Sequence, residues 1–155
     1  MATIQFHILT ASDSEAIKTI GGWYEAEWGI VREKSHENIL QAITDEQQFQ
    51  VLLSVDGRAV STAGMYRKVS IVDKVPELSR YKNWLALVYT VPECRGQGWG
   101  ELICTYVQEH SKKMGISDLY LFTDTAERLY CRLGWTLLER LTVGSRNVVV
   151  MTKRL

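Results

Sequence analysis

Apolar residues recur along the chain with two different periods, which separate strands from helices. Alternating or continuous apolar runs predict strands at residues 4–9, 49–55, 59–69, 84–91, 119–122, 135–143 and 147–153. Helical spacing predicts helices over residues 12–29, 35–43, 98–114 and 123–133. The order β-α-α-β-β-β-α-β-α-β-β indicates an α/β fold with a mixed, mostly antiparallel central sheet flanked by helices.

Local signals mark where several of these elements begin and end. Ser12-Asp13-Ser14-Glu15 matches a capping box, in which the Ser12 hydroxyl and the Glu15 carboxylate satisfy free N–H groups of a helix. Gly29 is expected to end that helix, and Asp56-Gly57 predicts a tight hairpin turn. Residues 71–83 contain Pro76 and little periodicity, so we expect a loop there.

Composition and charge narrow the classes of partner. The 155 residues are 46% hydrophobic and 23% charged, which is typical of one globular domain spanning 1–155. Lys plus Arg and Asp plus Glu number 18 each, so we expect no nucleic-acid and no membrane partner. The N-terminus lacks the apolar core of a signal peptide and no apolar run could span a bilayer, which predicts a cytoplasmic protein.

The cysteines and histidines do not form a metal motif. Cys94, Cys104 and Cys131 are odd in number and lack metal-ligand spacing, and the three histidines have no Cys or carboxylate at zinc-motif offsets. We therefore predict neither a disulfide nor a metal site. No histidine stands near Cys131 to activate its thiol, so we interpret Cys131 as a helix-packing residue.

The segment from Val88 to Gly100 carries the first functional signal. An apolar strand stops at Pro92, three glycines follow at alternate positions, and a helix comes next. Strand, glycine-rich turn and helix together aim backbone N–H groups and a helix N-terminus at an anion, usually a phosphate. The turn is not a Walker A loop, because no Lys-Ser or Lys-Thr follows, and Glu101 breaks a dinucleotide-binding frame. A purely structural turn is the alternative at this point.

A second motif lies one strand later. It has the pattern A-x-x-L-Y-x-x-L-G-F/W, filled by Ala126, Leu129, Tyr130, Leu133, Gly134 and Trp135. The first motif is a strand that ends at a proline, here Pro92, followed by R/Q-x-x-G-x-G/A, which is filled by Arg95, Gly98 and Gly100. Together the two stretches resemble the GNAT superfamily of acetyltransferases. The motifs cover roughly residues 84 to 138, and the order of elements extends the resemblance over the whole chain.

The resemblance implies acetyl-CoA as the co-substrate, and the missing ligand spacing already argues against a metal. Backbone groups of Val88, Tyr89 and Thr90 are expected to pair with the pantetheine arm. N–H groups of Gly96, Gln97, Gly98, Trp99, Gly100 and Glu101 are expected to hold the pyrophosphate, and Thr123 joins this cofactor-binding set. Arg95 adds positive charge there, or else is a solvated loop arginine or part of a structural ion pair.

The resemblance also makes Tyr130 the candidate catalytic residue. A phenol, with a pKa near 10, is a reasonable general acid for a departing thiolate, whose thiol has a pKa near 8.5. The alternative is an aromatic residue on the apolar stripe of its helix.

No general base is assigned. The candidates are Glu25, Glu27, Asp73 and Glu77, and each also fits a solvated surface carboxylate. Four aromatic residues, Trp23, Tyr24, Trp28 and Trp84, fit core packing better than the wall of a binding site.

The sequence thus predicts an N-acetyltransferase that moves an acetyl group from acetyl-CoA to a primary amine by direct attack. The acceptor is an unidentified small molecule, peptide or protein. The alternative is an acyl-CoA-binding regulatory or interaction domain without turnover. Many members of the family pair as dimers, so the resemblance leaves a homodimer open.

Overall fold

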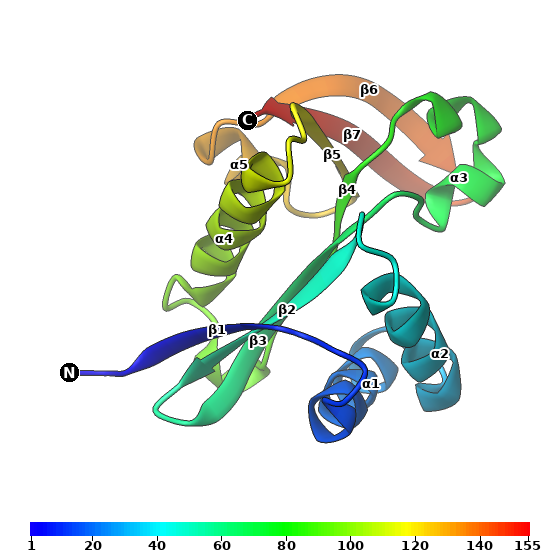
Figure 1. Ribbon diagram of the computed structural model, residues 1–155. Coiled ribbons are helices and arrows are strands. Elements are labelled where there is room, and N and C mark those ends of the chain that lie inside the picture. The colour runs from blue at the N-terminus through cyan, green and yellow to red at the C-terminus, as the bar shows by residue number, and fades with distance from the viewer. The chain divides into compact units, whose positions relative to one another are not determined.

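The computed structural model describes residues 1–155 and contains a seven-stranded sheet flanked by helices (Figure 1). The strands are β1 (Ile4–Ile8), β2 (Phe49–Val55), β3 (Arg58–Tyr66), β4 (Trp84–Thr90), β5 (Asp118–Thr123), β6 (Thr136–Val143) and β7 (Arg146–Arg154). The helices are α1 (Ser14–Trp28), α2 (Arg32–Ile43), α3 (Ile71–Lys74), η1 (Pro76–Arg80), η2 (Pro92–Cys94), α4 (Trp99–Lys113) and α5 (Glu127–Arg132).

The strand order is β1-β2-β3-β4-β5-β7-β6. β4 and β5 pair in parallel, whereas β1–β2, β5–β7 and β6–β7 are antiparallel pairs. The predicted mixed α/β fold is therefore confirmed. Contacts group the chain into two compact units, which we describe separately. Unit 1 comprises Met1–Gly64 with Leu87–Val107, and unit 2 comprises Met65–Ala86 with Gln108–Leu155.

In unit 1 the hairpin turn between β2 and β3 is the one predicted. Asp56 and Gly57 have φ angles of 52° and 82°, the left-handed values that a two-residue type I′ turn requires. Aspartate and glycine tolerate these values better than other residues do. The strand that follows ends at Tyr66, three residues before the predicted end.

The predicted capping box at the start of α1 is wrong. The Asp13 carboxylate accepts the Thr10 N–H at 2.7 Å and contacts the His7 ring at 2.9 Å, and no side chain caps the helix. The Ser12 hydroxyl pairs with the Thr10 hydroxyl at 2.9 Å. The side chains of Ser12 and Asp13 therefore form hydrogen bonds with residues that precede the helix, and neither is available to cap it. The predicted end is confirmed, because Gly29 adopts a left-handed φ of 69° directly after α1.

The start of α2 also differs from the prediction. The helix begins at Arg32, and Ser35 lies inside it as a buried residue. A serine often precedes a helix because its hydroxyl satisfies a free N–H group, which is why the sequence favoured Ser35 as the start.

In unit 2 the predicted loop at 71–83 is wrong, because it forms α3 and η1. Ile71, Val72 and Leu78 pack in one buried cluster with Trp84 and, from β7, Val148 and Val150. Two short helices each contribute one or two apolar residues to this cluster, so no long period appears in the sequence.

The last predicted helix is shorter than expected. α5 begins at Glu127 rather than Thr123. The Thr123 hydroxyl accepts the N–H groups of Thr125 and Ala126, at 3.3 and 3.1 Å, in the turn before the helix. A side-chain acceptor of this kind satisfies the N–H groups outside a helix, which favours a turn.

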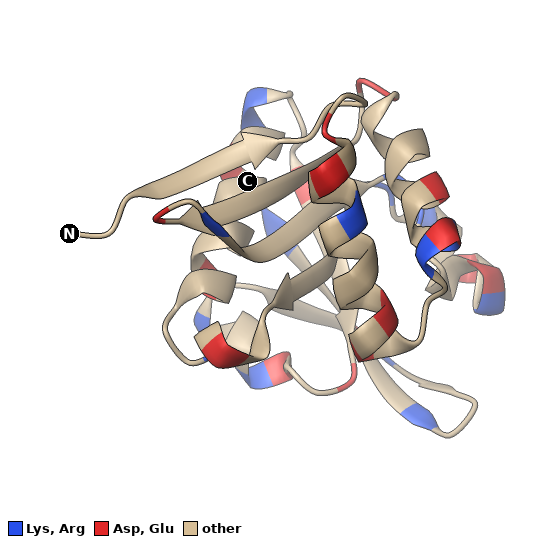
Figure 2. Cartoon of the chain, turned by 90° about the horizontal axis from the view of Figure 1, so that it is seen from below, with Lys and Arg blue, Asp and Glu red and all other residues tan.

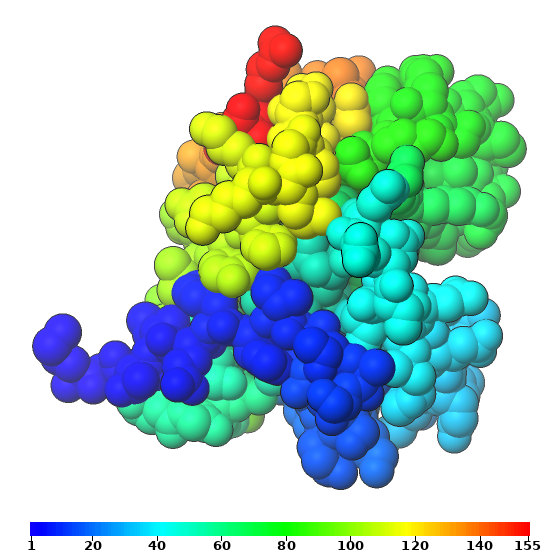
Figure 3. All heavy atoms as spheres, viewed as in Figure 1, coloured from blue at the N-terminus to red at the C-terminus, as the bar shows by residue number.

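Charges of both signs are spread over the helices and loops (Figure 2). Many form exposed ion pairs, among them Arg58–Glu93 and Lys68–Asp73. Met1 is fully exposed. The N-terminal segment, dark blue in Figure 3, projects from the surface. No helix has the length and apolar character needed to cross a membrane.

Candidate functional site

The glycine turn of unit 1 lies between the end of β4 and the first turn of α4. Gly96 and Gly98 have φ angles of 77° and 90°, which favour glycine over any residue with a side chain. A Cβ added at either position would meet no atom within 4 Å. The turn therefore presents bare backbone to open space.

The N–H groups of this turn are free. From Gly96 to Glu101 no backbone N–H donates a hydrogen bond within the chain, and the first bond of the helical ladder is Leu102 N–H to Gly98 O at 3.0 Å. α4 is 15 residues long, so its N-terminus carries a partial positive charge. Six consecutive free N–H groups at such a terminus can hold an anion, and the predicted pyrophosphate fits them.

Gly100 lies closer to other atoms of the chain than the two glycines before it. A Cβ at this position would lie 3.5 Å from the Thr90 hydroxyl oxygen. The Ser61 hydroxyl contacts that same oxygen at 3.0 Å and donates to the Tyr89 carbonyl at 2.8 Å. The first turn of α4 thus lies close to the end of β4, and a methyl group at this position would be in ordinary van der Waals contact with Thr90.

Arg95 is held by three groups. Its Nε donates to the Thr90 carbonyl at 2.8 Å, and its guanidinium lies 3.3 Å from a Glu27 carboxylate oxygen. The same guanidinium lies over the Tyr89 ring, 5.3 Å from the ring centre. Arg95 therefore links the glycine turn to β4 through Thr90 and Tyr89, and to α1 through Glu27. The pair of Arg95 with Glu27 is the structural ion pair that the sequence analysis gave as one alternative for this arginine.

The sequence did not predict a distortion in β4 at Leu87. Leu87 has a φ of 57°, which is unusual for a residue with a branched side chain. The Tyr24 hydroxyl donates to the Leu87 carbonyl at 2.7 Å and accepts from Gln50 Nε2 at 3.0 Å. Gln50 also donates to the Thr62 hydroxyl at 2.7 Å. The only signal in the sequence is Gln50, a polar residue within an apolar strand.

Tyr130 lies in α5 of unit 2 and is buried. Its ring meets that of Trp135 edge to face, with 6.0 Å between centres, and its carbonyl accepts the Trp135 N–H at 2.9 Å. Between them, Gly134 has a φ of 92° and turns the chain back. The spacing of the second motif therefore brings Trp135 onto Tyr130.

Most carboxylates considered as a base have other partners. Glu25 pairs with Arg32 at 2.8 Å, Glu27 with Arg95, and Asp73 with Lys68 at 2.8 Å. The fourth candidate, Glu77, is exposed.

Among the aromatic residues, Trp84 is fully buried, as predicted for the core, and Tyr24 is 1% exposed. Trp23 is half-buried and stacks on Tyr89, with 5.4 Å between ring centres. Trp28 is 45% exposed, so core packing does not describe it fully.

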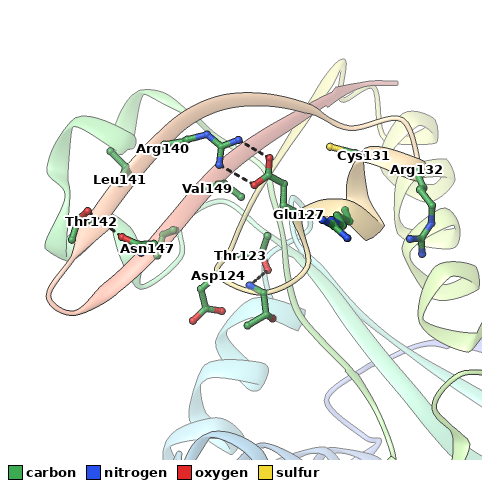
Figure 4. A pocket seen from close by; sticks show the side chains of 13 residues that line it. Thr123, Asp124, Glu127, Cys131, Arg132, Arg140, Leu141, Thr142, Asn147 and Val149 are labelled. Atoms are coloured by element: carbon green, nitrogen blue, oxygen red, sulfur yellow. Dashed lines mark hydrogen bonds and ion pairs between the residues drawn. The ribbon is translucent and has the colours of Figure 1, made fainter.

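A hollow of about 980 Å³ lies in unit 2 (Figure 4). Residues of α5, including Cys131, line it together with Thr123 and residues of the β6–β7 hairpin. Within it, both carboxylate oxygens of Glu127 accept from Arg140, at 3.0 and 2.9 Å. Cys131 is exposed, so its interpretation as a packing residue is wrong. The sequence did not single out this hollow, because its residues are spread over α5 and two strands.

Solved structures with the same architecture exist. One is an aminoglycoside 6'-N-acetyltransferase complexed with coenzyme A, with a TM-score of 0.76 and 12% identity over 97% of this chain and 96% of that one. Another is the aminoglycoside 6'-N-acetyltransferase from Enterococcus faecium, with a TM-score of 0.74 and 12% identity over 97% and 96%. A third is the PaiA N-acetyltransferase from Thermoplasma acidophilum in complex with coenzyme A, with a TM-score of 0.69 and 18% identity over 99% of both chains. At these identities the likeness shows the fold.

The sequence gives a separate result. None of the curated proteins matches the chain. The family model for the acetyltransferase (GNAT) domain matches residues 45–137, which is more than half of the 155 residues and includes the glycine turn and the whole second motif. The chain belongs to the GNAT acetyltransferase family.

Proposed function

We propose that this protein is an acetyl-CoA-dependent N-acetyltransferase in which residues 1–155 act as one domain. The observation that carries the proposal is the row of free N–H groups from Gly96 to Glu101 at the start of α4. The coenzyme A named in two of the similar structures belongs to those proteins, and it supports the same class of ligand here.

Residues of unit 1 would hold the co-substrate. The free N–H groups would bind its pyrophosphate, and the open space at Gly96 and Gly98 would let phosphate oxygens approach the backbone. Backbone groups of Val88 to Thr90 would pair with the pantetheine amides. Arg95 would act mainly by keeping the turn in place, because its own contacts are within the protein. Thr123, the last residue of β5, completes the proposed cofactor-binding set.

Acetyl-CoA supplies an acetyl group already activated as a thioester. A neutral amine attacks the carbonyl carbon, the carbon–sulfur bond breaks, and the sulfur leaves with the electron pair. Tyr130 then donates its phenolic proton to the sulfur, and a proton lost by the amine returns to Tyr130 through water. The products are an N-acetyl amine and a free thiol.

The acceptor must reach the site as a neutral amine. A lysine-like amine with a pKa of about 10.4 is neutral in about one molecule in 2,500 at pH 7, which costs roughly 4.6 kcal/mol. An α-amine with a pKa near 8 costs only about 1 kcal/mol. Because Glu25, Glu27 and Asp73 already form ion pairs, an acceptor that needs little help with deprotonation suits this chain better.

Thiol release from acetyl-CoA across a panel of amines tests the proposal. Tyr130→Phe removes only the hydroxyl and is expected to lower kcat by about 10²- to 10⁴-fold, with the Kd for acetyl-CoA unchanged. Tyr120→Phe, the same change at another tyrosine of unit 2, is expected to keep wild-type kcat. Acetyl-CoA binding without turnover of any amine would favour the alternative, an acyl-CoA-binding regulatory domain. Equal kcat in wild type and Tyr130→Phe would refute the acid role.

A further inference from the structure

The hollow of unit 2 lies on one side of α5. Four of the six residues of this helix line it, namely Glu127, Arg128, Cys131 and Arg132, whereas Tyr130 does not. Residues spaced in this way share one face of a helix. Tyr130 is instead buried against Trp135. The hollow is therefore a feature separate from the proposed acid.

Both carboxylates in the hollow are already neutralised. Glu127 accepts two hydrogen bonds from Arg140, and Asp124 pairs with Arg146 at 3.0 Å. The close-up shows the Glu127 and Arg140 side chains pointing toward each other (Figure 4). Paired carboxylates of this kind offer little to an incoming cation, because a new ligand would have to displace an arginine.

Two arginines in the hollow have no such partner. Arg128 and Arg132 form no ion pair or hydrogen bond with the protein, and both are exposed. The hollow therefore has an excess of positive charge, although the chain as a whole has none. A concave surface that collects one sign of charge attracts ligands of the opposite sign.

The remaining lining suits a small organic molecule better than a bare ion. Leu141, Val148 and Val149 give it apolar surface, while Thr142 and Asn147 add polar groups. Its volume of about 980 Å³ is large for a single inorganic ion. It lies at the upper end of the roughly 300–1,000 Å³ typical of ligand pockets.

We propose that the hollow between α5 and the β6–β7 hairpin binds a small organic anion that carries a phosphate or carboxylate group. Arg128 and Arg132 bind the anionic group, and the apolar residues of the hairpin contact the rest of the molecule. The hollow shares Thr123 with the proposed cofactor-binding set, but Arg128, Arg132 and the hairpin residues lie outside that set, and the proposal does not require acetyl transfer.

Cys131 supplies a reporter inside the hollow. Its thiol is exposed, and it lines the same hollow as Arg128 and Arg132. Cys104 is buried and Cys94 half-buried. In a Cys94→Ser background, modification by an aromatic disulfide therefore reports on Cys131, with Cys131→Ser as the blank.

The experiment compares two disulfides of opposite character on the folded full-length protein. The dianionic reagent 5,5'-dithiobis(2-nitrobenzoate) is expected to react faster with Cys131 than the neutral 4,4'-dithiodipyridine, once each rate is divided by that for free cysteine. The double variant Arg128→Gln/Arg132→Gln is expected to lower this ratio by about tenfold. Lys112→Gln/Lys113→Gln changes net charge equally in the same unit but outside the hollow, and is expected to leave the ratio unchanged.

Protection by anions identifies the source of the ligand. Phosphate, citrate and coenzyme A are each added in increasing concentration at constant ionic strength. The rate at which the neutral reagent modifies Cys131 is measured at each concentration. Saturable protection by phosphate or citrate that is lost in Arg128→Gln/Arg132→Gln supports a separate anionic ligand. Saturable protection by coenzyme A alone would assign the hollow to the phosphates of the co-substrate and would overturn the proposal of a separate ligand. The proposal is overturned if no anion gives saturable protection. It is also overturned if the ratio of the dianionic to the neutral reaction rate is the same in Arg128→Gln/Arg132→Gln and in Lys112→Gln/Lys113→Gln.

Discussion

The hydroxyl of Tyr24 joins α1 to the distorted residue of β4. It donates to the Leu87 carbonyl at 2.7 Å and accepts from Gln50, which is fully buried. Tyr24→Phe leaves that carbonyl without this donor, so we expect a loss of about 1–3 kcal/mol in the free energy of unfolding. Urea denaturation measures the loss, with Tyr120→Phe as the matched tyrosine control. A loss equal to that of the control would contradict the role of this network.

Asp13 gives a residue-level prediction about pH. The Thr10 N–H and the His7 ring hold the pKa of the Asp13 carboxyl below its usual value. A lowered pKa means that the stabilisation is present above the unfolded pKa of about 3.9 and is lost as pH falls through the folded value. Asp13→Asn should therefore be less stable than wild type at about pH 7, and the difference should shrink toward about pH 2.5. Urea denaturation at the two pH values checks this. A constant difference would contradict the account.

Single residues were predictable where the backbone demands a residue type. Asp56-Gly57 and Gly29 follow from the left-handed φ angles that their turns need. Leu87 could not be predicted, because an apolar residue in an apolar run carries no mark of a positive φ. Its conformation depends on contacts with Tyr24, which is 63 residues away in the chain.

At the scale of elements, the turn before α5 depends on one hydroxyl. Thr123 accepts two N–H groups, from Thr125 and Ala126. Thr123→Val keeps the shape but removes the acceptor, so we expect a loss of about 0.5–2 kcal/mol in the free energy of unfolding. Thr123→Ser keeps a hydroxyl and should lose less. Thermal and urea denaturation of the pair measure this, and equal losses would mean that the hydroxyl does not hold the turn.

Elements with a long, regular period were predicted well, and short ones were not. α4 begins and ends within one residue of its predicted limits, because its apolar stripe is continuous from the glycine turn to Gly115. α3 and η1 were missed, because each is too short to show a period. The predicted capping box at Ser12 and the predicted helix start at Ser35 were wrong for a related reason. A serine can cap a helix or lie inside one, and the residue type alone does not tell the two apart.

For the whole molecule, two motifs carried the prediction further than composition could. The glycine turn and the Tyr130 motif indicated the family, which the family model over 45–137 now shows. The hollow of unit 2 was not predictable, because its residues come from three elements. The pairing of β6 with β7 brings Arg140 and Asn147 together, and Arg128 comes from α5. The acceptor class is beyond the sequence for the same reason, since no single stretch defines it.

The most direct test of the central claim is the Kd for acetyl-CoA in two glycine variants, measured by isothermal titration calorimetry beside wild type. Gly98→Ala and Gly144→Ala each place a methyl group at a positive φ, 90° and 63°, where nothing lies within 4 Å. Each should lose about 1–2 kcal/mol of stability from the backbone alone. Wild type and Gly144→Ala should bind with micromolar Kd, while Gly98→Ala should bind at least about tenfold more weakly, a loss of about 1.4 kcal/mol. Equal Kd values in the two variants would contradict the claim that the glycine turn binds acetyl-CoA. No binding to wild type at millimolar acetyl-CoA would contradict it as well.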